Sequence, residues 1–557
     1  MRRTPVSTSD DSQANRTNRR RFLEGLAALG GGASLAMSAG SSPNAAPAQQ
    51  GSRDPAPLAT SNGWYVQNGR AIWGYGLHND WWGGYRGLPT GWWTDCPLRP
   101  SLIRNAPGRS GPNLTEDLDK LTDSMRTYGF PGFEHTPPLW YDRRRDAHDV
   151  QARGDGNVVG PFLEMPWGRS KQGQAWDGLP LYDLSTFNPW YFARIKEFAD
   201  LCDRKGCILV FNFYNQHNLL ETQAHYCDFP WRPVNCIEAT DLPDTTPAAH
   251  AFYDTTHRLR RELHRQYITH CLDNLRDNRN VVFLTSLEYT GPLAFLQFWL
   301  ETILEWERQS GRKVHVGLGA TRDVVDAVLQ DDRHKPRIDT IDLRYWHSTR
   351  DGSLVAPRGG QDVPGRYVGG ASRMTPAQIY QQVKEYRRLY PDKALLHTIG
   401  ADQEQTMAFL MAGGSMLLRG LDYVREHPPT YEMPLGCEHI LSVYEFIRTH
   451  LASDLPRMKP LDVVDNPEVV SCLGEPGRGY LIYMSSRPPG DPSRGSLRGA
   501  FHLDLTDAPG RFDAKWIGLS LGTVFDAYGG SLQGGKVLSL GALDWRPWLL
   551  WLKQRTE

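Results

Sequence analysis

A short apolar run that ends in a single carboxylate constrains the fold of this chain most. Residues 281–287 are mainly apolar, Glu288 follows them directly, and Gly291 and Pro292 then break the run. A short apolar run bounded by turn residues predicts a buried strand of a parallel sheet. In a β/α barrel, the residue that leaves the C-terminal end of such a strand points into the active site. Glu288 is therefore the first candidate for a catalytic group.

The N-terminus has the pattern of an export signal. Residues 19–23 read Arg-Arg-Arg-Phe-Leu, a Gly/Ala/Leu stretch covers 25–37, and Ala46-Pro47-Ala48 offers a cleavage site. We expect residues 1–48 to be a twin-arginine (Tat) signal peptide that engages the Tat export machinery and delivers a periplasmic or secreted protein. A basic tail or a membrane anchor is the alternative, but the apolar stretch is shorter than the roughly 20 residues that span a bilayer.

The composition excludes some partners and favours others. The formal net charge is −1, without the basic patch of a nucleic-acid binder, and no Cys/His spacing resembles a zinc site. We therefore expect no nucleic-acid partner, no cofactor and no catalytic metal, while a structural calcium and the oligomeric state stay open. Many of the 18 tryptophans stand beside polar residues, a pattern that suits stacking on sugar rings.

Eight cysteines in an exported chain permit disulfides. Cys227 and Cys236 bracket a proline-containing loop and form the favoured pair. Cys202 and Cys207 lie at a helix–strand junction and are expected to be buried thiols.

Alternating strand and helix patterns predict an α/β fold, a (β/α)8 TIM barrel, over residues 62–455, after a linker at 49–61. The expected barrel strands are 71–76, 132–135, 207–213, 281–286, 313–317, 340–345, 394–398 and 415–418. The expected helices include 115–128, 189–204, 250–277, 292–310, 376–390, 404–411 and 437–451. Short alternating segments split by Gly, Pro and Asp then predict a small antiparallel β-sandwich at residues 456–557.

Polar and aromatic residues gather where the predicted barrel strands end. Because these ends meet at one rim of a barrel, the residues there suit a ligand with many hydroxyls. The candidate substrate-binding residues are His78, Asp80, Trp81, Glu134, His135, Arg143, Asn215, His217, Arg344, Tyr345, Trp346 and His397. Taken singly, any of them could instead belong to a structural hydrogen-bond network.

Glycoside hydrolysis needs two carboxyl groups that flank the scissile bond. Glu288 supplies one of them. The strand at 394–398 carries no carboxylate, so the second catalytic candidates are Asp402 and Glu404 in the segment that follows it. A helix cap and first-turn acid is the structural alternative for both. The rival carboxylates are Asp80, Glu134 and Asp342.

Several sequence blocks resemble an uncharacterised bacterial family of exported TIM-barrel proteins. The matching blocks are residues 138–148, 176–179, 216–221, 224–233, 288–292, 323–329 and 342–346. More distantly, the chain resembles clan A glycoside hydrolases of the apiosidase-like type, which carry a C-terminal sandwich labelled collagen-binding. The resemblance implies a barrel plus a sandwich, a carbohydrate substrate and an acid/base at Glu288. The chain departs from the clan A pattern in two places. Leu287 stands where these enzymes usually have an asparagine before the acid/base glutamate, and the glutamate of the seventh strand is missing.

These observations together predict an exported glycoside hydrolase that cleaves a plant or microbial polysaccharide or oligosaccharide. Arg344 and the run Arg143–Arg145 favour an acidic sugar, because a guanidinium binds a carboxylate with two hydrogen bonds. Salt bridges within the protein are the more frequent alternative for three consecutive arginines. One alternative is a polysaccharide lyase, with Tyr345 or a histidine as the base and Arg344 neutralising a uronate. Another is a non-catalytic carbohydrate-binding barrel, which the missing seventh-strand glutamate would explain.

Overall fold

The computed structural model describes most of the chain outside its N-terminal segment and several loops. The described residues are 55–78, 104–105, 117–137, 162–220, 223–344, 361, 374–398, 403–418, 438–465, 470–485, 500–519, 522–541, 543 and 546–555. The expected signal peptide lies outside them, and the proposed domain boundaries stay predictions. Within these ranges, no helix combines the length and the apolar character that crossing a membrane requires.

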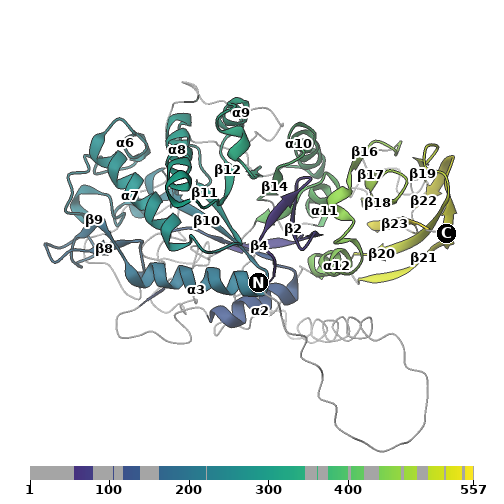
Figure 1. Cartoon of the computed structure of the whole chain (residues 1–557), viewed down its shortest axis with the longest axis horizontal. Coiled ribbons are helices and arrows are strands. Elements are labelled where there is room, and N and C mark those ends of the chain that lie inside the picture. Colours follow the sequence, from purple (N-terminus) through teal and green to yellow (C-terminus); the bar gives the residue numbers. More distant parts are fainter. Residues whose placement is uncertain are drawn as a thin grey trace, which may run out of the picture.

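Eight parallel strands close into a barrel (Figure 1), which confirms the predicted fold class. In order around the barrel they are β4 (Tyr75–His78), β6 (Gly132–His135), β10 (Ile208–Asn215), β11 (Val281–Leu287), β12 (His315–Gly319), β13 (Thr340–Asp342), β14 (Ala394–His397) and β15 (Met416–Leu418). The first expected strand is displaced, because Gly74 interrupts it with a φ of 155°. A Cβ on Gly74 would lie 2.6 Å from the Gly129 carbonyl oxygen, so only glycine fits there.

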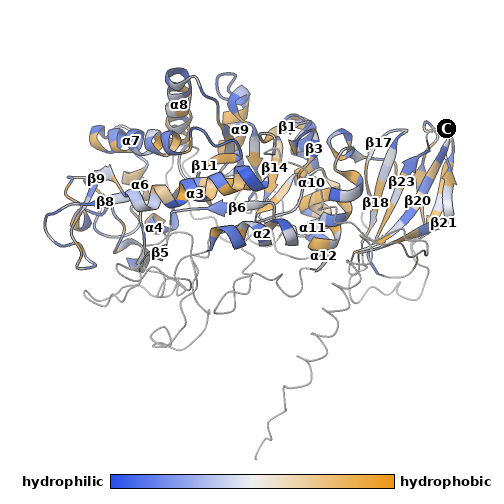
Figure 2. Cartoon of the chain, turned by 60° about the horizontal axis from the view of Figure 1, so that its bottom comes forward, coloured by the Kyte–Doolittle hydropathy of each residue, from blue (hydrophilic) through white to orange (hydrophobic). Residues whose placement is uncertain are grey.

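Helices cover the outside of the barrel, and most of them are amphipathic, with hydrophobic and hydrophilic residues along the same helix in Figure 2. They are α2 (Leu118–Tyr128), α3 (Pro189–Lys205), α7 (Arg258–Asn274), α8 (Leu293–Ser310), α9 (Arg322–Gln330), α10 (Pro376–Leu389), α11 (Gln403–Met411) and α12 (Glu438–Phe446). The single helix expected at 250–277 is wrong: α6 (Ala249–Phe252) precedes α7. Asp254 separates them, because its carboxylate accepts from the backbone N–H of Thr256 and favours a turn.

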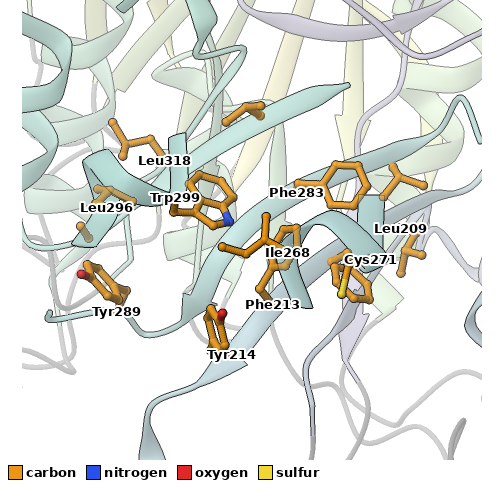
Figure 3. Packing of buried hydrophobic residues seen from close by; sticks show 14 of the residues in the cluster. Leu209, Phe213, Tyr214, Ile268, Cys271, Phe283, Tyr289, Leu296, Trp299 and Leu318 are labelled. Atoms are coloured by element: carbon orange, nitrogen blue, oxygen red, sulfur yellow. The ribbon is translucent and has the colours of Figure 1, made fainter. Parts of the chain in front are cut away.

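The core between the barrel and its helices is rich in aromatic residues (Figure 3). Phe213 of β10 and Phe283 of β11 pack against each other, with ring centroids 5.7 Å apart. Trp299 of α8 lies 5.7 Å from Phe213 in an edge-to-face contact, and Ile268 of α7 belongs to the same cluster. This packing fixes the two strands whose ends carry the candidate site.

Shorter elements lie outside the barrel. Three small sheets are formed by β1 (Ala59–Ser61), β2 (Trp64–Gln67) and β3 (Arg70–Ala71); by β5 (Arg104–Asn105) and β7 (Phe162–Leu163); and by β8 (Trp167–Arg169) and β9 (Tyr182–Phe187). Two short helices, α4 (His217–Leu220) and α5 (Gln223–Tyr226), follow β10.

Antiparallel strands form the C-terminal region, as expected. They are β16 (Lys459–Leu461), β17 (Val470–Glu475), β18 (Gly479–Met484), β19 (Ala500–Asp504), β20 (Arg511–Gly518), β21 (Thr523–Gln533), β22 (Val537–Gly541) and β23 (Trp548–Gln554). Six of them pair in the order β16-β17-β18-β23-β20-β21, and β19 pairs with β22. Phe501 and Leu540 of the two-stranded sheet share a buried cluster with Phe512 and Leu550 of the larger sheet, which forms the core of a sandwich.

The other face of the six-stranded sheet packs against the barrel's last helices. Leu481 and Leu549 share a buried cluster with Met407 and Leu410 of α11 and with Val443 of α12. In Figures 1 and 2 the sheet stands beside these two helices. The barrel and the sheet therefore share one continuous apolar contact.

The cysteines differ in part from the expectation. Cys202 and Cys207 are buried thiols, as predicted. The Cys227–Cys236 disulfide is wrong, since both of these residues are thiols. Instead, the Cys236 thiol lies 3.5 Å from the carbonyl oxygens of Arg232 and Glu238, to which it donates.

The shared cluster makes the sheet and the barrel depend on each other for stability. We expect Leu481→Ala to lower the free energy of unfolding by roughly 2–5 kcal/mol, because it leaves a cavity in this contact. Val537→Ala is the matched control: Val537 is 52% exposed, so its truncation should change stability by about 0.5 kcal/mol or less. Urea unfolding measures both, and equal effects would contradict the role given to the contact.

Candidate active site

Glu288 lies directly beyond the C-terminal end of β11, the fourth strand of the barrel. Its backbone has a φ of 51°, in the left-handed region that residues other than glycine rarely adopt. Its side chain is 13% exposed, and its Oε2 lies 2.8 Å from Nε2 of His217. A carboxyl group is thus held at the barrel rim by a defined partner, close to the surface.

His217 reaches Glu288 because β10 and β11 end at the same level. The two strands are parallel, and their last registered pair is Asn215 with Leu287. Asn215 is the last residue of β10, and its carboxamide oxygen accepts from the backbone N–H of His217 at 3.2 Å. The structure therefore brings three predicted site residues together: Asn215, His217 and Glu288.

A buried ion network crosses the inside of the barrel near this rim. The Arg344 guanidinium donates from Nη2 to Glu134 and from Nε to Asp342. Glu134 lies in β6 and Asp342 is the last residue of β13. These are the second and sixth strands, which lie opposite each other in a closed barrel of eight. Asn212 of β10 also donates to Glu134, at 2.9 Å.

Burial and neighbouring charges act on this network in opposite directions. Burial raises the pKa of Asp342 to about 6; Arg344 opposes that rise, while Glu134 and Glu288 add to it. Burial also lowers the pKa of Arg344, but the carboxylates of Asp342, Glu134 and Glu288 outweigh it, so the net shift is upward and Arg344 stays charged. Its charge is therefore balanced by carboxylates of the protein itself.

Two predicted histidines lie on the helix side of their strands, in line with the alternation of side chains along a strand. His135 is fully buried, and its Nε2 lies 2.7 Å from the Tyr191 hydroxyl of α3. His397 pairs with Gln382 of α10 at 3.1 Å. Burial lowers the pKa of each to about 3, so both stay neutral at physiological pH.

Glu404 accepts a hydrogen bond of 2.7 Å from the Tyr483 hydroxyl of β18. Tyr483 belongs to the cluster between the barrel and the C-terminal sheet. The described contacts of Glu404 thus face the sheet and do not bring it together with Glu288. This matches the structural alternative for an acid in the first turn of α11.

The remaining predicted residues lie outside what the structure describes. They are Asp80, Trp81, Arg143, Tyr345, Trp346, Asp402 and the side chain of His78. Two described residues were not selected from the sequence, namely Asn212 and Gln216. An asparagine inside the otherwise apolar β10 is a signal that could have identified the first. Gln216 contacts backbone groups around Glu288, and no local pattern announces such a contact.

The described residues contain no group of three or more His, Cys, Asp or Glu arranged to hold a metal ion. Within these ranges, Glu288 is instead paired with His217, and Glu134 and Asp342 are paired with Arg344.

A closed parallel barrel with carboxylates at the carboxyl ends of its strands defines the broad class of this protein, the TIM-barrel proteins. The chain belongs to the family described as "Domain of unknown function (DUF6298)", whose profile matches residues 35–424. No curated protein matches the sequence.

The solved structures that this chain resembles include glycoside hydrolases. A glycoside hydrolase family 5 protein from Bacteroides vulgatus ATCC 8482 aligns with a TM-score of 0.52 and 10% identity, covering 90% of this chain and 93% of that chain. A structure titled "Glycoside hydrolase" aligns with a TM-score of 0.48 and 9% identity, covering 90% and 98%. At 10% identity, the similarity to the family 5 structure shows the fold alone.

The buried network predicts how stability depends on pH. Because the pKa of Asp342 is about 6 in the folded protein and near 3.8 ordinarily, the folded state binds this proton more tightly than the unfolded state. The resulting stabilisation is present below about pH 4 and is lost as the pH rises towards about 6. The free energy of unfolding of the wild type should therefore fall by about 1–3 kcal/mol relative to that of Asp342→Asn across this window. Urea titrations at several pH values measure the difference, and parallel pH curves for the two proteins would contradict it.

Proposed function

We propose that the protein is a glycoside hydrolase in which Glu288 protonates the glycosidic oxygen. The observation that carries this proposal is the Glu288–His217 pair at the carboxyl end of the fourth barrel strand. A general acid must lie near the surface to reach a sugar and must be held in one orientation, and Glu288 meets both requirements. The shared fold with glycoside hydrolases supports the same assignment.

In the proposed reaction, the Glu288 carboxyl gives its proton to the leaving oxygen as the glycosidic C–O bond breaks. A second carboxylate then attacks the sugar or activates a water that does so. Asp402 is the proposed second group, because Glu404 is engaged by Tyr483 and because Glu134 and Asp342 are buried against Arg344. A separation of roughly 5 Å from Glu288 would favour retention, and one of roughly 6.5–9.5 Å inversion.

The proposed substrate is a plant or microbial polysaccharide or oligosaccharide met outside the cytoplasm, after export through the Tat machinery. An acidic sugar would depend on Arg143 rather than on Arg344, whose charge Glu134 and Asp342 already balance. The same balance weakens the lyase alternative, which relied on Arg344 to neutralise a uronate.

The first test compares Glu288→Gln with the wild type on a panel of neutral and uronate-containing oligosaccharides. The variant should lose about 10²–10⁴-fold in turnover, the usual contribution of a general acid, while its fold stays intact. Mass spectrometry follows the addition of one water across the products, and near-ultraviolet absorbance reports any unsaturated uronate. Full activity in the variant would refute the assignment, and an absorbing product without added water would identify a lyase.

A second pair of variants tests the other carboxylate. We expect Asp402→Asn to lose activity on the same panel by at least about 10²-fold, and Glu404→Gln to keep it within about threefold, since only the first is assigned to the reaction. Product release over time provides the comparison. The reverse ranking would return the second catalytic role to Glu404.

A further inference from the structure

We propose that Gln216 is the positioning residue for the general acid, because its side-chain amide holds the backbone turn that presents Glu288. This inference rests on the proposed function of Glu288 and extends it to a residue outside the reacting groups. It is carried by hydrogen bonds between Gln216 and the backbone on both sides of Tyr289.

The Gln216 amide continues the pairing of β10 with β11 after the strands have ended. Its Nε2 donates to the carbonyl oxygen of Glu288, and its Oε1 accepts from the backbone N–H of Thr290 at 2.8 Å. In a parallel ladder, a residue donates to the carbonyl before its partner and accepts from the N–H after it. The side-chain amide of Gln216 therefore takes the place of a backbone peptide group paired with Tyr289.

The turn needs such support because its central residue is strained. With a φ of 51°, Glu288 occupies a backbone conformation that costs about 1–2 kcal/mol in a residue with a side chain. Any relaxation towards the ordinary region would redirect the carboxyl group. A strained backbone persists only where its surroundings hold it in place.

Buried neighbours hold the turn from the helix side. Leu287 is 5% exposed and Tyr289 is 1% exposed, so the residues on both sides of Glu288 are anchored in the core. Figure 3 shows Tyr289 among the residues of the buried cluster. Its ring stacks 6.3 Å from Phe295, and its hydroxyl donates to the Pro292 carbonyl oxygen at 2.7 Å. Gln216, directly after β10, holds the turn from the other side, and Glu288 lies between Gln216 and these buried neighbours.

Gln216 and His217 are consecutive residues that both bind Glu288, the first at its main chain and the second at its carboxyl group. Gln216 binds the carbonyl of Glu288, while His217 binds its carboxylate at 2.8 Å. A displacement of about 1 Å in a catalytic group is enough to cost about 10²-fold in rate. Loss of the Gln216 amide should therefore impair proton donation without removing the proton donor.

Substrates with different leaving groups distinguish this positioning role from a purely structural one. Phenyl glycosides need a proton at the departing oxygen, whereas 2,4-dinitrophenyl glycosides depart without one. We use both, as glycosides of the sugar that the oligosaccharide panel identifies. We expect Gln216→Leu to lower kcat/KM about 10²-fold on the phenyl glycoside and less than about threefold on the dinitrophenyl glycoside.

Asn280→Leu is the matched control, because Asn280 is a buried amide at the opposite end of β11. Its Oδ1 accepts from the backbone N–H of Leu58 at 3.0 Å, and its Nδ2 donates to the Cys202 carbonyl oxygen at 3.3 Å. Its loss should lower stability but leave the ratio of the two kcat/KM values unchanged. A change in that ratio confined to Gln216→Leu supports the proposal, and an equal change in both variants overturns it.

The pH dependence of activity in the variant Gln216→Glu provides a second test. Only the protonated carboxyl of this variant can donate to the Glu288 carbonyl oxygen while accepting from Thr290, so its activity on the phenyl glycoside relative to wild type should rise as the pH falls. A constant ratio to wild type across pH would count against the proposal.

A crystal structure of Gln216→Leu tests the geometry without any substrate. We expect the Glu288 carboxylate to lie beyond hydrogen-bond distance of His217, and an unchanged pair would overturn the proposal. Failure of the proposed function looks different: Glu288→Gln would then keep full activity, whatever Gln216→Leu does. An inactive Glu288→Gln beside a fully active Gln216→Leu would refute the positioning role alone.

Discussion

The pairing of Arg344 with Glu134 and Asp342 is the interaction on which the rest of the site depends. A charged guanidinium inside a barrel is tolerated only when carboxylates compensate for its lost hydration. Because these carboxylates come from opposite strands, the pairing also ties the two sides of the barrel together just beneath the rim. The rim residues therefore stand above a buried network of paired charges.

The barrel could be predicted from sequence because its strands are short apolar runs between turn residues, a local property. All eight expected strands overlap strands of the closed barrel, and β6 is the same at both ends. The location of Glu288 follows from the same rule, since the end of a buried parallel strand is visible in the sequence. The predictions were wrong where a single residue interrupts a local pattern. Gly74 interrupts the first expected strand, and Asp254 divides the helix expected at 250–277.

The partners of the site residues could not be predicted, because they depend on contacts between distant segments. Glu404 and Tyr483 are 79 positions apart, the first in helix α11 and the second in strand β18 of the C-terminal sheet. His135 and His397 stand at strand ends, as expected, but nothing in the sequence says which side of the strand each one faces. Arg344 was selected for its charge, and its two carboxylate partners lie on separate strands.

The hydrogen bond between Glu404 and Tyr483 has a consequence for how this architecture can change during evolution. Asp402 stands two positions before Glu404, so the chain that leaves the seventh barrel strand is tethered to the C-terminal sheet almost at once. The sheet therefore holds the first turn of α11, the helix that follows the seventh barrel strand, rather than being an interchangeable appendage. Lineages that lose or replace this sheet would have to find another partner for that turn.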